Sequence, residues 1–382
     1  MTVGCACPID FVMNGKGENL RRGWTTGACA TAAAKAAVQA LLGGGFPDPV
    51  EITLPKGQTV AFALADHCLK PGAAMAAVVK DAGDDPDVTH GALIVVTARP
   101  AATGAGILFR AGEGVGTVTL PGLPVPPGEA AINPMPRQMI AAAIAEVAGP
   151  EADFEIEIAV PGGAALAERT LNGRLGIING LSILGTTGIV IPFSCAAWID
   201  SIHRGIDVAR ATGQDHIAGS TGSTSERVVE AHHGLDPKQL IEMGDFIGGM
   251  LKYLRTHPVP RVTIAGGVAK MSKLAQGMLD VHSKRGRADQ QALADIATSV
   301  GGDAALAAKI TASNTVAEAF GHAAAAGIQL GDAVAARAWQ VAAPVLQDTG
   351  SALEILVIDR DGKIRGVAPF RAVHGARPRN RR

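Results

Sequence analysis

The first residues of the chain that could bind a ligand are two arginines and a helix-start motif. They are Arg21, Arg22, Thr25, Thr26 and Gly27. A helix N-terminus presents N–H groups and the positive end of the helix dipole to an anion, and arginine adds a two-pronged contact to a carboxylate. The alternative is a helix with an ordinary threonine cap, and the sequence leaves both interpretations open.

Four carboxylates lie within seven residues in the segment that runs from residue 81 to residue 90. They are Asp81, Asp84, Asp85 and Asp87. Aspartate and the intervening Pro86 both favour turns, so a structural turn between two strands is one interpretation. Because close carboxylates repel one another, a loop that meets a cation or a ligand hydroxyl is the other.

A glycine-rich segment covers residues 172–188. Between a strand and a helix, such a segment lets the backbone approach an adenosine or another flat ligand. It is not a G-x-G-x-x-G motif, and no acidic residue follows about twenty positions later, which argues against a dinucleotide site. Residues 175–199 carry no formal charge and are long enough to span a bilayer. The central Gly-Thr-Thr-Gly would leave backbone groups unsatisfied in lipid, so we predict a buried strand, a turn and a helix instead.

The second half of the chain offers a carboxylate, two lysines and a histidine. Asp245 follows a strand-like run, where its carboxylate could accept hydrogen bonds from ribose hydroxyls or cap the next helix. Lys270 and Lys273 share one side of a helix, which suits either a ligand with several carboxylates or a solvated face. His282 could move a proton, contact a metal, or serve as a hydrogen-bonded structural histidine.

The composition argues against several classes of protein. The chain has 382 residues, 34 basic and 35 acidic side chains, and 3% aromatic residues, which does not favour a nucleic-acid binder. Five scattered cysteines without a C-x-x-C motif indicate neither a disulfide framework nor a zinc ribbon, and they fit a reducing cytoplasm. We see no signal peptide and expect a cytoplasmic protein without a membrane partner.

The order of the expected elements predicts two domains. Residues 1–165 combine helices at 28–42 and 134–147 with strands such as 92–97, 107–111 and 154–160, which is typical of an α+β domain. Residues 166–370 alternate strand-like and helical segments, which indicates a Rossmann-like α/β domain with a mostly parallel sheet. The arginine-rich residues 371–382 are expected to form a disordered basic tail.

Separated segments, taken in order, resemble the cobalt-precorrin-5B C1-methyltransferase family (the CbiD family). The matching segments are Arg22–Ala30 (RGWTTGACA), Lys80–Gly91 (KDAGDDPDVTHG), Gly128–Pro134 (GEAAINP), Leu175–Pro192, Glu242–Phe246 (EMGDF) and His282–Ser283. The resemblance implies methyl transfer from S-adenosylmethionine to ring carbon C1 of a corrin precursor, a tetrapyrrole, in cobalamin biosynthesis. Cobalt then belongs to the substrate, and no metal held by the protein is expected.

For the reaction that the resemblance implies, we assign residue roles as hypotheses, which the resemblance itself does not settle. The expected donor contacts are Ser182, Gly185, Thr186, Thr187, Gly188 and Asp245. The expected catalytic residues are His282 and Ser283, with His282 taking the proton released when C1 becomes quaternary. The expected substrate contacts are Arg21, Arg22, Thr25, Thr26, Gly27, Asp84, Asp85, Arg137, Arg174, Lys270 and Lys273. The basic residues among them suit the acetate and propionate groups of the macrocycle.

Two other functions stay open at this point. A nicotinamide-dependent reductase of a cobalt-precorrin is compatible with a Rossmann-like domain, and a tetrapyrrole carrier without catalysis would use the same basic residues. Neither alternative involves nucleic acid. A homo-oligomer is compatible with all of these functions.

Overall fold

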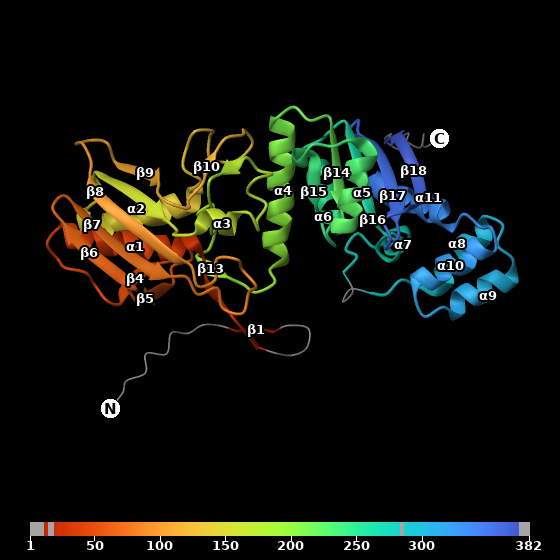
Figure 1. Cartoon of the computed structure of the whole chain (residues 1–382), viewed down its shortest axis with the longest axis horizontal. Coiled ribbons are helices and arrows are strands. Elements are labelled where there is room, and N and C mark those ends of the chain that lie inside the picture. Colours follow the sequence, from red (N-terminus) through yellow and green to blue (C-terminus); the bar gives the residue numbers. More distant parts are fainter. Residues whose placement is uncertain (1–10, 14–18, 283–285, 374–382) are drawn as a thin grey trace, which may run out of the picture. The chain divides into compact units, whose positions relative to one another are not determined.

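The computed structural model describes residues 11–13, 19–282 and 286–373. The chain divides into two compact units, unit 1 (Met1–Ser194) and unit 2 (Cys195–Arg382), and each has a sheet and a core of its own (Figure 1). The expected domain boundary after residue 165 lies inside unit 1, because residues 177–190 pair with strands of that unit.

Unit 1 is built on a five-stranded sheet with the order β6-β7-β8-β11-β9. Its strands are β6 (Asp66–Lys70), β7 (Ala73–Val79), β8 (Leu93–Pro100), β11 (Phe154–Ala159) and β9 (Ile107–Ala111). All neighbours are antiparallel except β11 and β9, which are parallel. Alternate residues of β8 and β11 are buried, as expected for a sheet with one well-covered face.

Helices α1 (Thr26–Leu41) and α2 (Pro134–Ala148) pack together and supply the helical part of the unit 1 core. Half of the residues of α1 are alanine, and nearly the whole helix is buried. Alanine has the highest helix propensity, and its small side chain lets the helix lie close to β7 and β8. The alanine-rich sequence therefore favours both the formation of this helix and its close packing on the sheet.

Short pairs complete unit 1. They are β1 (Phe11–Met13) with β2 (Asn19–Arg21), β3 (Gly23–Trp24) with β13 (Ile189–Val190), β4 (Val50–Thr53) with β5 (Thr59–Phe62), and β10 (Thr117–Val118) with β12 (Ile177–Ile178). The short helix α3 (Gly163–Ala167) follows β11. The β3/β13 pair brings the glycine-rich segment to the start of α1.

Unit 2 is built on a second five-stranded sheet, with the order β15-β14-β16-β17-β18. Its strands are β14 (His216–Ser220), β15 (Leu240–Glu242), β16 (Arg261–Gly267), β17 (Ala352–Ile358) and β18 (Ile364–Ala372). The first four strands are parallel, and β18 is antiparallel to β17.

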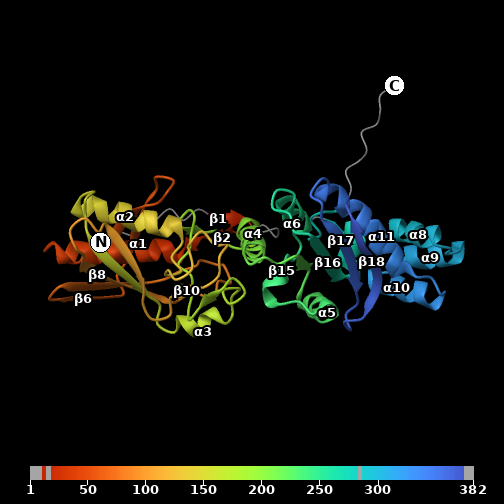
Figure 2. The same cartoon turned by 90° about the horizontal axis from the view of Figure 1, so that it is seen from above.

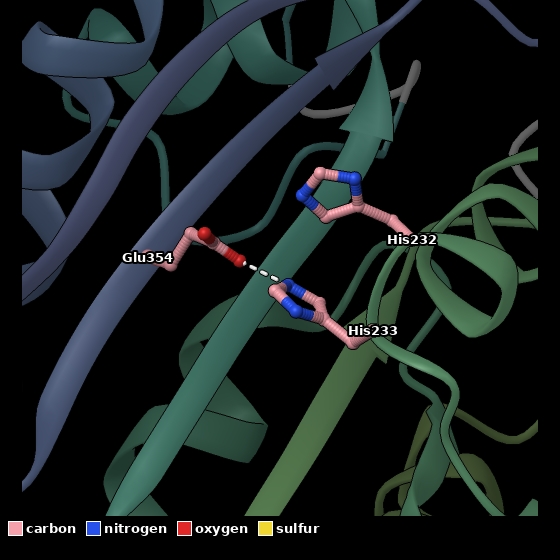
Figure 3. Close-up of side chains that lie close together, drawn as sticks. All are labelled: His232, His233 and Glu354. Atoms are coloured by element: carbon pink, nitrogen blue, oxygen red, sulfur yellow. Dashed lines mark hydrogen bonds and ion pairs between the residues drawn. The ribbon is translucent and has the colours of Figure 1, made fainter.

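Helix α5 (Ser223–His233) packs on one face of this sheet through a small apolar cluster that contains Val229, Ala265 and Leu356. At the end of the same helix, His232 and His233 lie near Glu354 of β17 (Figure 3). A short 3₁₀ helix, η1 (Pro237–Gln239), leads from α5 to β15.

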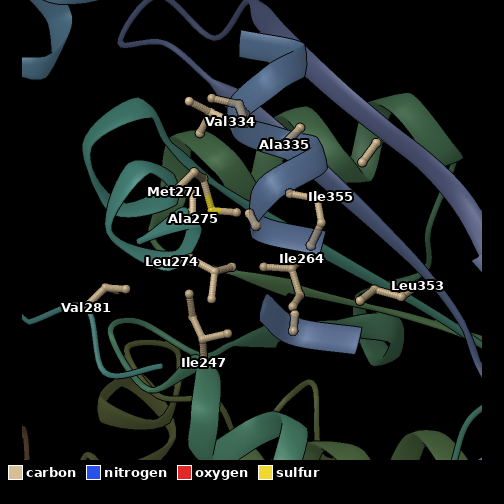
Figure 4. Packing of buried hydrophobic residues seen from close by; sticks show 14 of the residues in the cluster. Ile247, Ile264, Met271, Leu274, Ala275, Val281, Val334, Ala335, Leu353 and Ile355 are labelled. Atoms are coloured by element: carbon tan, nitrogen blue, oxygen red, sulfur yellow. The ribbon is translucent and has the colours of Figure 1, made fainter. Parts of the chain in front are cut away.

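The opposite face of the sheet carries the larger core of unit 2. Ile264 and Ile355 of the sheet contact Met271, Leu274 and other side chains of that cluster (Figure 4). The helices that contribute include α4 (Cys195–Ala211), α6 (Ile247–Leu254), α7 (Val268–Ala275) and α11 (Leu330–Ala342), followed by the 3₁₀ helix η2 (Ala343–Leu346).

Three further helices, α8 (Gln290–Ser299), α9 (Ala304–Ala312) and α10 (Val316–Ala325), form a group that packs on α7 and α11 (Figure 2). They lie in the connection between β16 and β17. Aspartate or threonine caps the start of each: Asp289, Asp303 and Thr315 accept hydrogen bonds from N–H groups of the first turn.

The predicted fold, an α+β domain followed by a Rossmann-like domain, is wrong. Both main sheets are mixed: unit 1 has one parallel pair among antiparallel ones, and unit 2 ends in an antiparallel strand. In addition, a helical group rather than a single crossover helix joins β16 to β17. Alternating strand and helix patterns indicate the elements, but they do not determine strand direction or the length of a crossover.

Residues 175–199 do not form one helix but β12, β13 and the start of α4. Among the described residues, the model contains no helix with the length and apolarity needed to cross a bilayer. Strand β18 continues to Ala372, so the expected tail begins within a strand, and residues 374–382 lie outside the described residues.

Candidate active site

The start of α1 and the glycine-rich segment lie against each other in unit 1. Thr25 caps the helix, because its Oγ1 accepts a hydrogen bond from the Ala28 N–H at 3.2 Å. The Gly27 N–H donates to the Leu184 carbonyl oxygen, and the Thr25 N–H donates to the Gly188 carbonyl oxygen, each at 3.0 Å. These three N–H groups therefore have partners within the chain, and an anion at this helix start stays a prediction.

Glycine is required at two positions of this contact. Gly185 has a φ of 140°, and a Cβ there would lie 2.2 Å from the Oγ1 of Thr25. Gly188 has a φ of 82°, and a Cβ there would lie 2.6 Å from the Cδ2 of Leu54. We expected these glycines to let a methyl donor approach the backbone. In the structure, Thr25 and Leu54 of unit 1 occupy the space beside them. Thr186 between them is exposed, while Ser182 and Thr187 are half-buried.

Residues 81–90, which we call the acidic loop, bind the segment that precedes α1. Arg21 donates to both carboxylate oxygens of Asp81, and the Arg21 N–H donates to Oδ2 of Asp84 at 2.7 Å. A Cβ at Gly23 would lie 2.0 Å from the carbonyl carbon of Ala82, so the two backbones can approach only because this residue is glycine. The hydrogen bonds from Arg21 lower the pKa of Asp81, which keeps this carboxylate charged.

The other two carboxylates of the loop also have partners in unit 1. Oδ1 of Asp85 accepts a hydrogen bond from the Phe193 N–H at 2.8 Å. Lys80 is 1% exposed, and its Nζ donates to Oδ2 of Asp87 at 2.7 Å. Burial acts to raise the pKa of Asp87, but Lys80 and the Thr89 hydrogen bonds outweigh burial and lower it. All four carboxylates of the loop therefore form hydrogen bonds or ion pairs with other residues of unit 1.

The remaining basic residues predicted in unit 1 lie on separate elements. Nε of Arg137, on α2, donates to the Ile132 carbonyl oxygen at 2.8 Å, and its Nη2 forms an ion pair with Glu129 at 2.8 Å. Arg22 lies between β2 and β3, Arg174 lies in the turn before β12, and both are half-buried. Their contact with a substrate stays a prediction.

A second group of residues meets at the carboxyl ends of parallel strands in unit 2, and we call it the strand-end cluster. It consists of Thr221, Gly222, Asp245, Gly267, Lys270 and Lys273. The first two residues follow β14, Asp245 follows β15, and Gly267 ends β16. In parallel α/β sheets, ligands commonly bind where such carboxyl ends meet.

Lys270 connects the loops of the strand-end cluster. Its Nζ donates to the Thr221 carbonyl oxygen at 2.8 Å and forms an ion pair with Oδ1 of Asp245 at 3.0 Å. A Cβ at Gly222 or at Gly267 would meet no atom within 4 Å, so both loops border open space. The cluster therefore combines a carboxylate, an ammonium group and room for a ligand.

Lys273 and the backbone of Val281 connect residues 280–282 to this cluster. Lys273 is 8% exposed, and its Nζ donates to the Val281 carbonyl oxygen at 3.1 Å. The Val281 N–H donates to the Asp245 carbonyl oxygen at 3.1 Å, which holds residues 280–282 beside the cluster. His282 is half-buried, and its N–H donates to Oδ1 of Asp280 at 3.2 Å. Ser283 lies outside the described residues.

The predicted residues thus form two groups, one in each unit. The expected donor contacts are divided between them, since residues 182–188 belong to unit 1 and Asp245 belongs to unit 2. Thr221 and Gly222 were not predicted from the sequence, although a run of serine, threonine and glycine between a strand and a helix was a visible signal. The partner of Arg21 was not predicted either, because an ion pair across 60 residues, such as Arg21 with Asp81, leaves no local pattern.

Two family models match the chain. The model described as CbiD matches residues 13–192, and the model described as CbiD, C-terminal domain, matches residues 280–369. The matches confirm the family resemblance inferred from the separated segments.

Named relatives of the chain agree with these models, and one solved structure was also found. A cobalt-precorrin-5B C(1)-methyltransferase of Agrobacterium fabrum is 61% identical over 375 residues, which cover 97% of this chain and 100% of the relative. The protein of the same name from Halorhodospira halophila is 60% identical and covers 91% of this chain and 94% of the relative. The crystal structure of the cobalamin biosynthesis protein CbiD from Archaeoglobus fulgidus is 27% identical, covers 72% of this chain and 86% of that one, and has a TM-score of 0.40. On the two family models and the relatives at 60–61% identity, the chain belongs to the CbiD family.

Proposed function

We propose that this protein methylates ring carbon C1 of cobalt-precorrin-5B in cobalamin biosynthesis. The observation that carries the proposal is the 60–61% identity to cobalt-precorrin-5B C(1)-methyltransferases over 94–100% of their lengths. The matched region includes both units of the chain. Cobalt enters as part of the tetrapyrrole substrate.

The methyl donor in this proposal is S-adenosylmethionine, and the strand-end cluster is the group that suits it best. The Asp245 carboxylate is an acceptor for ribose hydroxyls, and Lys270 holds it in place at 3.0 Å. Gly222 and Gly267 leave space at the ends of β14 and β16, where an adenosyl group can approach the backbone. Donor contacts from residues 182–188 stay a prediction.

The chemistry requires alignment more than it requires a reactive side chain. The bond between sulfur and the methyl carbon breaks while the bond from that carbon to C1 forms, and the electron pair of the broken bond stays on sulfur. The protein must hold sulfur, methyl and C1 in line and keep water away. We propose His282 as the group that accepts the proton, because residues 280–282 lie beside the strand-end cluster.

The carboxylates of the macrocycle need cationic partners. The Arg21 side chain forms an ion pair with Asp81 and is still 37% exposed, so a second carboxylate can reach its guanidinium. We propose it as a substrate contact together with Arg22 and Arg174. A cytoplasmic location and a homo-oligomeric assembly stay predictions from the sequence.

A mass-spectrometric assay tests the proposed function. The full chain is incubated with cobalt-precorrin-5B and with S-adenosylmethionine that carries a deuterated methyl group. We expect one labelled methyl group in the product, located at C1 by nuclear magnetic resonance, and an equal amount of S-adenosylhomocysteine. A carrier would bind the tetrapyrrole without any change in its mass, and a reductase would consume NADPH; either result would overturn the proposal.

The donor site is tested by the substitution Asp245→Asn. Because the variant loses a charged acceptor for the ribose, we expect donor affinity to fall by about tenfold in calorimetry with S-adenosylhomocysteine. Asp215→Asn, which changes an exposed carboxylate paired with Arg261, is the matched control and should leave this affinity unchanged. Equal donor affinity in both variants would remove Asp245 from the site.

A further inference from the structure

Three side chains gather in unit 2 near the amino ends of the parallel strands, away from the strand-end cluster. His232 and His233 close the last turn of α5, and Glu354 is the third residue of β17. One ligand atom from each residue lies within 4.8 Å of the others (Figure 3). We propose that His232, His233 and Glu354 bind a divalent transition-metal ion of the Zn²⁺ type, a site separate from the methyl-transfer chemistry.

The Glu354 carboxylate supplies the first argument. Glu354 is 5% exposed, and among the described residues no lysine or arginine forms an ion pair with it. Its Oε2 accepts hydrogen bonds from Nε2 of His233 at 2.6 Å and from Oγ1 of Thr263 at 2.9 Å. A buried carboxylate is costly unless a positive charge compensates it, and a dication beside two imidazoles provides that charge.

The surroundings hold the ligands in position. Thr263 lies directly opposite Glu354 in the pairing of β16 with β17, and its Oγ1 is 2.9 Å from Nε2 of His216. The Phe370 ring lies 5.7 Å from the His233 ring and 5.2 Å from the His216 ring, between centroids. Hydrogen bonds and packing that orient ligand side chains in this way are typical of metal sites.

The ligand types select the class of metal. Two imidazole nitrogens and one carboxylate oxygen suit Zn²⁺ and similar ions, and they leave a fourth position open for water or an anion. Mg²⁺ and Ca²⁺ prefer oxygen ligands throughout. In the structure Nε2 of His233 lies 2.6 Å from Oε2 of Glu354, so the two atoms must separate to roughly 3.3 Å around a tetrahedral ion, and the ring nitrogen that binds the ion must carry no proton.

The site is open to solution on the side of His232. His232 is exposed and lines a hollow of about 730 Å³ between α5 and the turn that joins β17 to β18. The hollow also carries Arg227, Arg360 and Lys363, with Asp361 as the acidic residue.

Calorimetry on the full chain without a histidine tag, stripped of metal by a chelator, tests the site. We expect one Zn²⁺ per chain at neutral pH and no heat with Mg²⁺. His232→Ala and Glu354→Gln should each lower the Zn²⁺ affinity by about tenfold or more. His67→Ala, which removes an exposed histidine of unit 1, should leave the affinity unchanged.

A second readout covers the case in which Glu354→Gln fails to fold. His232 is exposed, so His232→Ala should melt at the same temperature as the unmodified chain when no metal is present. Zn²⁺ should raise the Tm of the unmodified chain and of His67→Ala, but not that of His232→Ala. Absence of Zn²⁺ binding, or binding that His232→Ala leaves intact, would overturn the proposal, and neither result bears on methyl transfer, because donor and substrate are absent.

Discussion

A buried ammonium group dominates the energetics of the acidic loop at the scale of single residues. Lys80 is 1% exposed and forms its ion pair with Asp87, whose side chain is 25% exposed. Breaking such a pair costs more than the pair itself contributes, because the remaining charge stays buried. The loop that presents Asp84 and Asp85 therefore depends on a pair that lies outside the expected site.

The substitution Asp87→Asn should lower the free energy of unfolding by about 3 kcal/mol, because it leaves Lys80 buried without a counter-charge. Chemical denaturation measures this change. The double variant Lys80→Met/Asp87→Asn should recover most of the loss, since both charges are then absent. Asp215→Asn, at an exposed ion pair, should cost less than about 1 kcal/mol. A loss for Asp87→Asn as small as that of the control would show that Lys80 is solvated.

Two cysteines should differ sharply in reactivity. Cys29 lies within α1 and is fully buried, and burial raises the pKa of its thiol to about 12. The thiolate is the reactive form, so Cys29 should stay unmodified by iodoacetamide at pH 8 in the folded protein. Cys195 is exposed and should be alkylated. Peptide mapping separates the two sites, and rapid modification of Cys29 in the native protein would contradict the packing of α1.

Residue types were the most predictable part of the site, and residue partners were the least. The sequence indicated Asp245, Lys270 and Lys273 as charged groups near strand ends, and the structure joins the first two by an ion pair. It did not indicate that Lys273 would be buried, because its position one turn after Lys270 suggests a shared face. Burial of Lys273 depends on Val281, which belongs to a segment with no periodic pattern.

At the scale of elements, the contact between α1 and the glycine-rich segment depends on glycines, which have no side chain. Gly185→Ala should lower the free energy of unfolding by about 2–3 kcal/mol, because its Cβ would overlap Thr25 at a positive φ. Gly128→Ala is the control: Gly128 has a φ of 92°, but a Cβ there meets no atom within 4 Å. Comparison of the two variants by thermal unfolding isolates the overlap from the backbone strain. Equal losses would show that Thr25 moves aside.

Local patterns predicted many elements closely. The strand expected at 107–111 is β9, and the helix expected at 134–147 is α2. The pairing of these elements could not be predicted in the same way. β9 lies parallel to β11 although the strands around it are antiparallel, and this choice depends on the path of residues 112–153 rather than on the strand residues. Strand direction is a property of connections, which carry no periodicity.

At the scale of the whole molecule, each unit has its own hydrophobic core, one built around α1 and the other around β16 and β17. We therefore expect calorimetry to resolve two unfolding transitions. Asp87→Asn should move only the transition of unit 1, while Ile264→Ala, at a fully buried position of β16, should move only that of unit 2. A single transition that both variants shift equally would show that the units unfold together.

The prediction of a domain boundary near residue 165 shows why the division of the chain is hard to infer. Residues 172–190 have the glycines and short apolar runs of a strand-turn-helix unit, and these features favoured placing them with the second half. In the structure their strands, β12 and β13, each pair with only two residues of β10 and β3. Pairs of this length leave almost no trace in a sequence, although they decide which unit a segment joins.

The long connection from Gly267 to Ala352, which carries α7 to α11, separates two strands that lie side by side in the sheet of unit 2. Closing such a loop is entropically unfavourable until the helices within it have packed, so β17 should join the sheet late in refolding. Amide protons of β17 and β18 should then gain protection in pulse-labelling experiments after those of α8 to α10. During synthesis, this sheet can be completed only after residues up to Ala372 have left the ribosome.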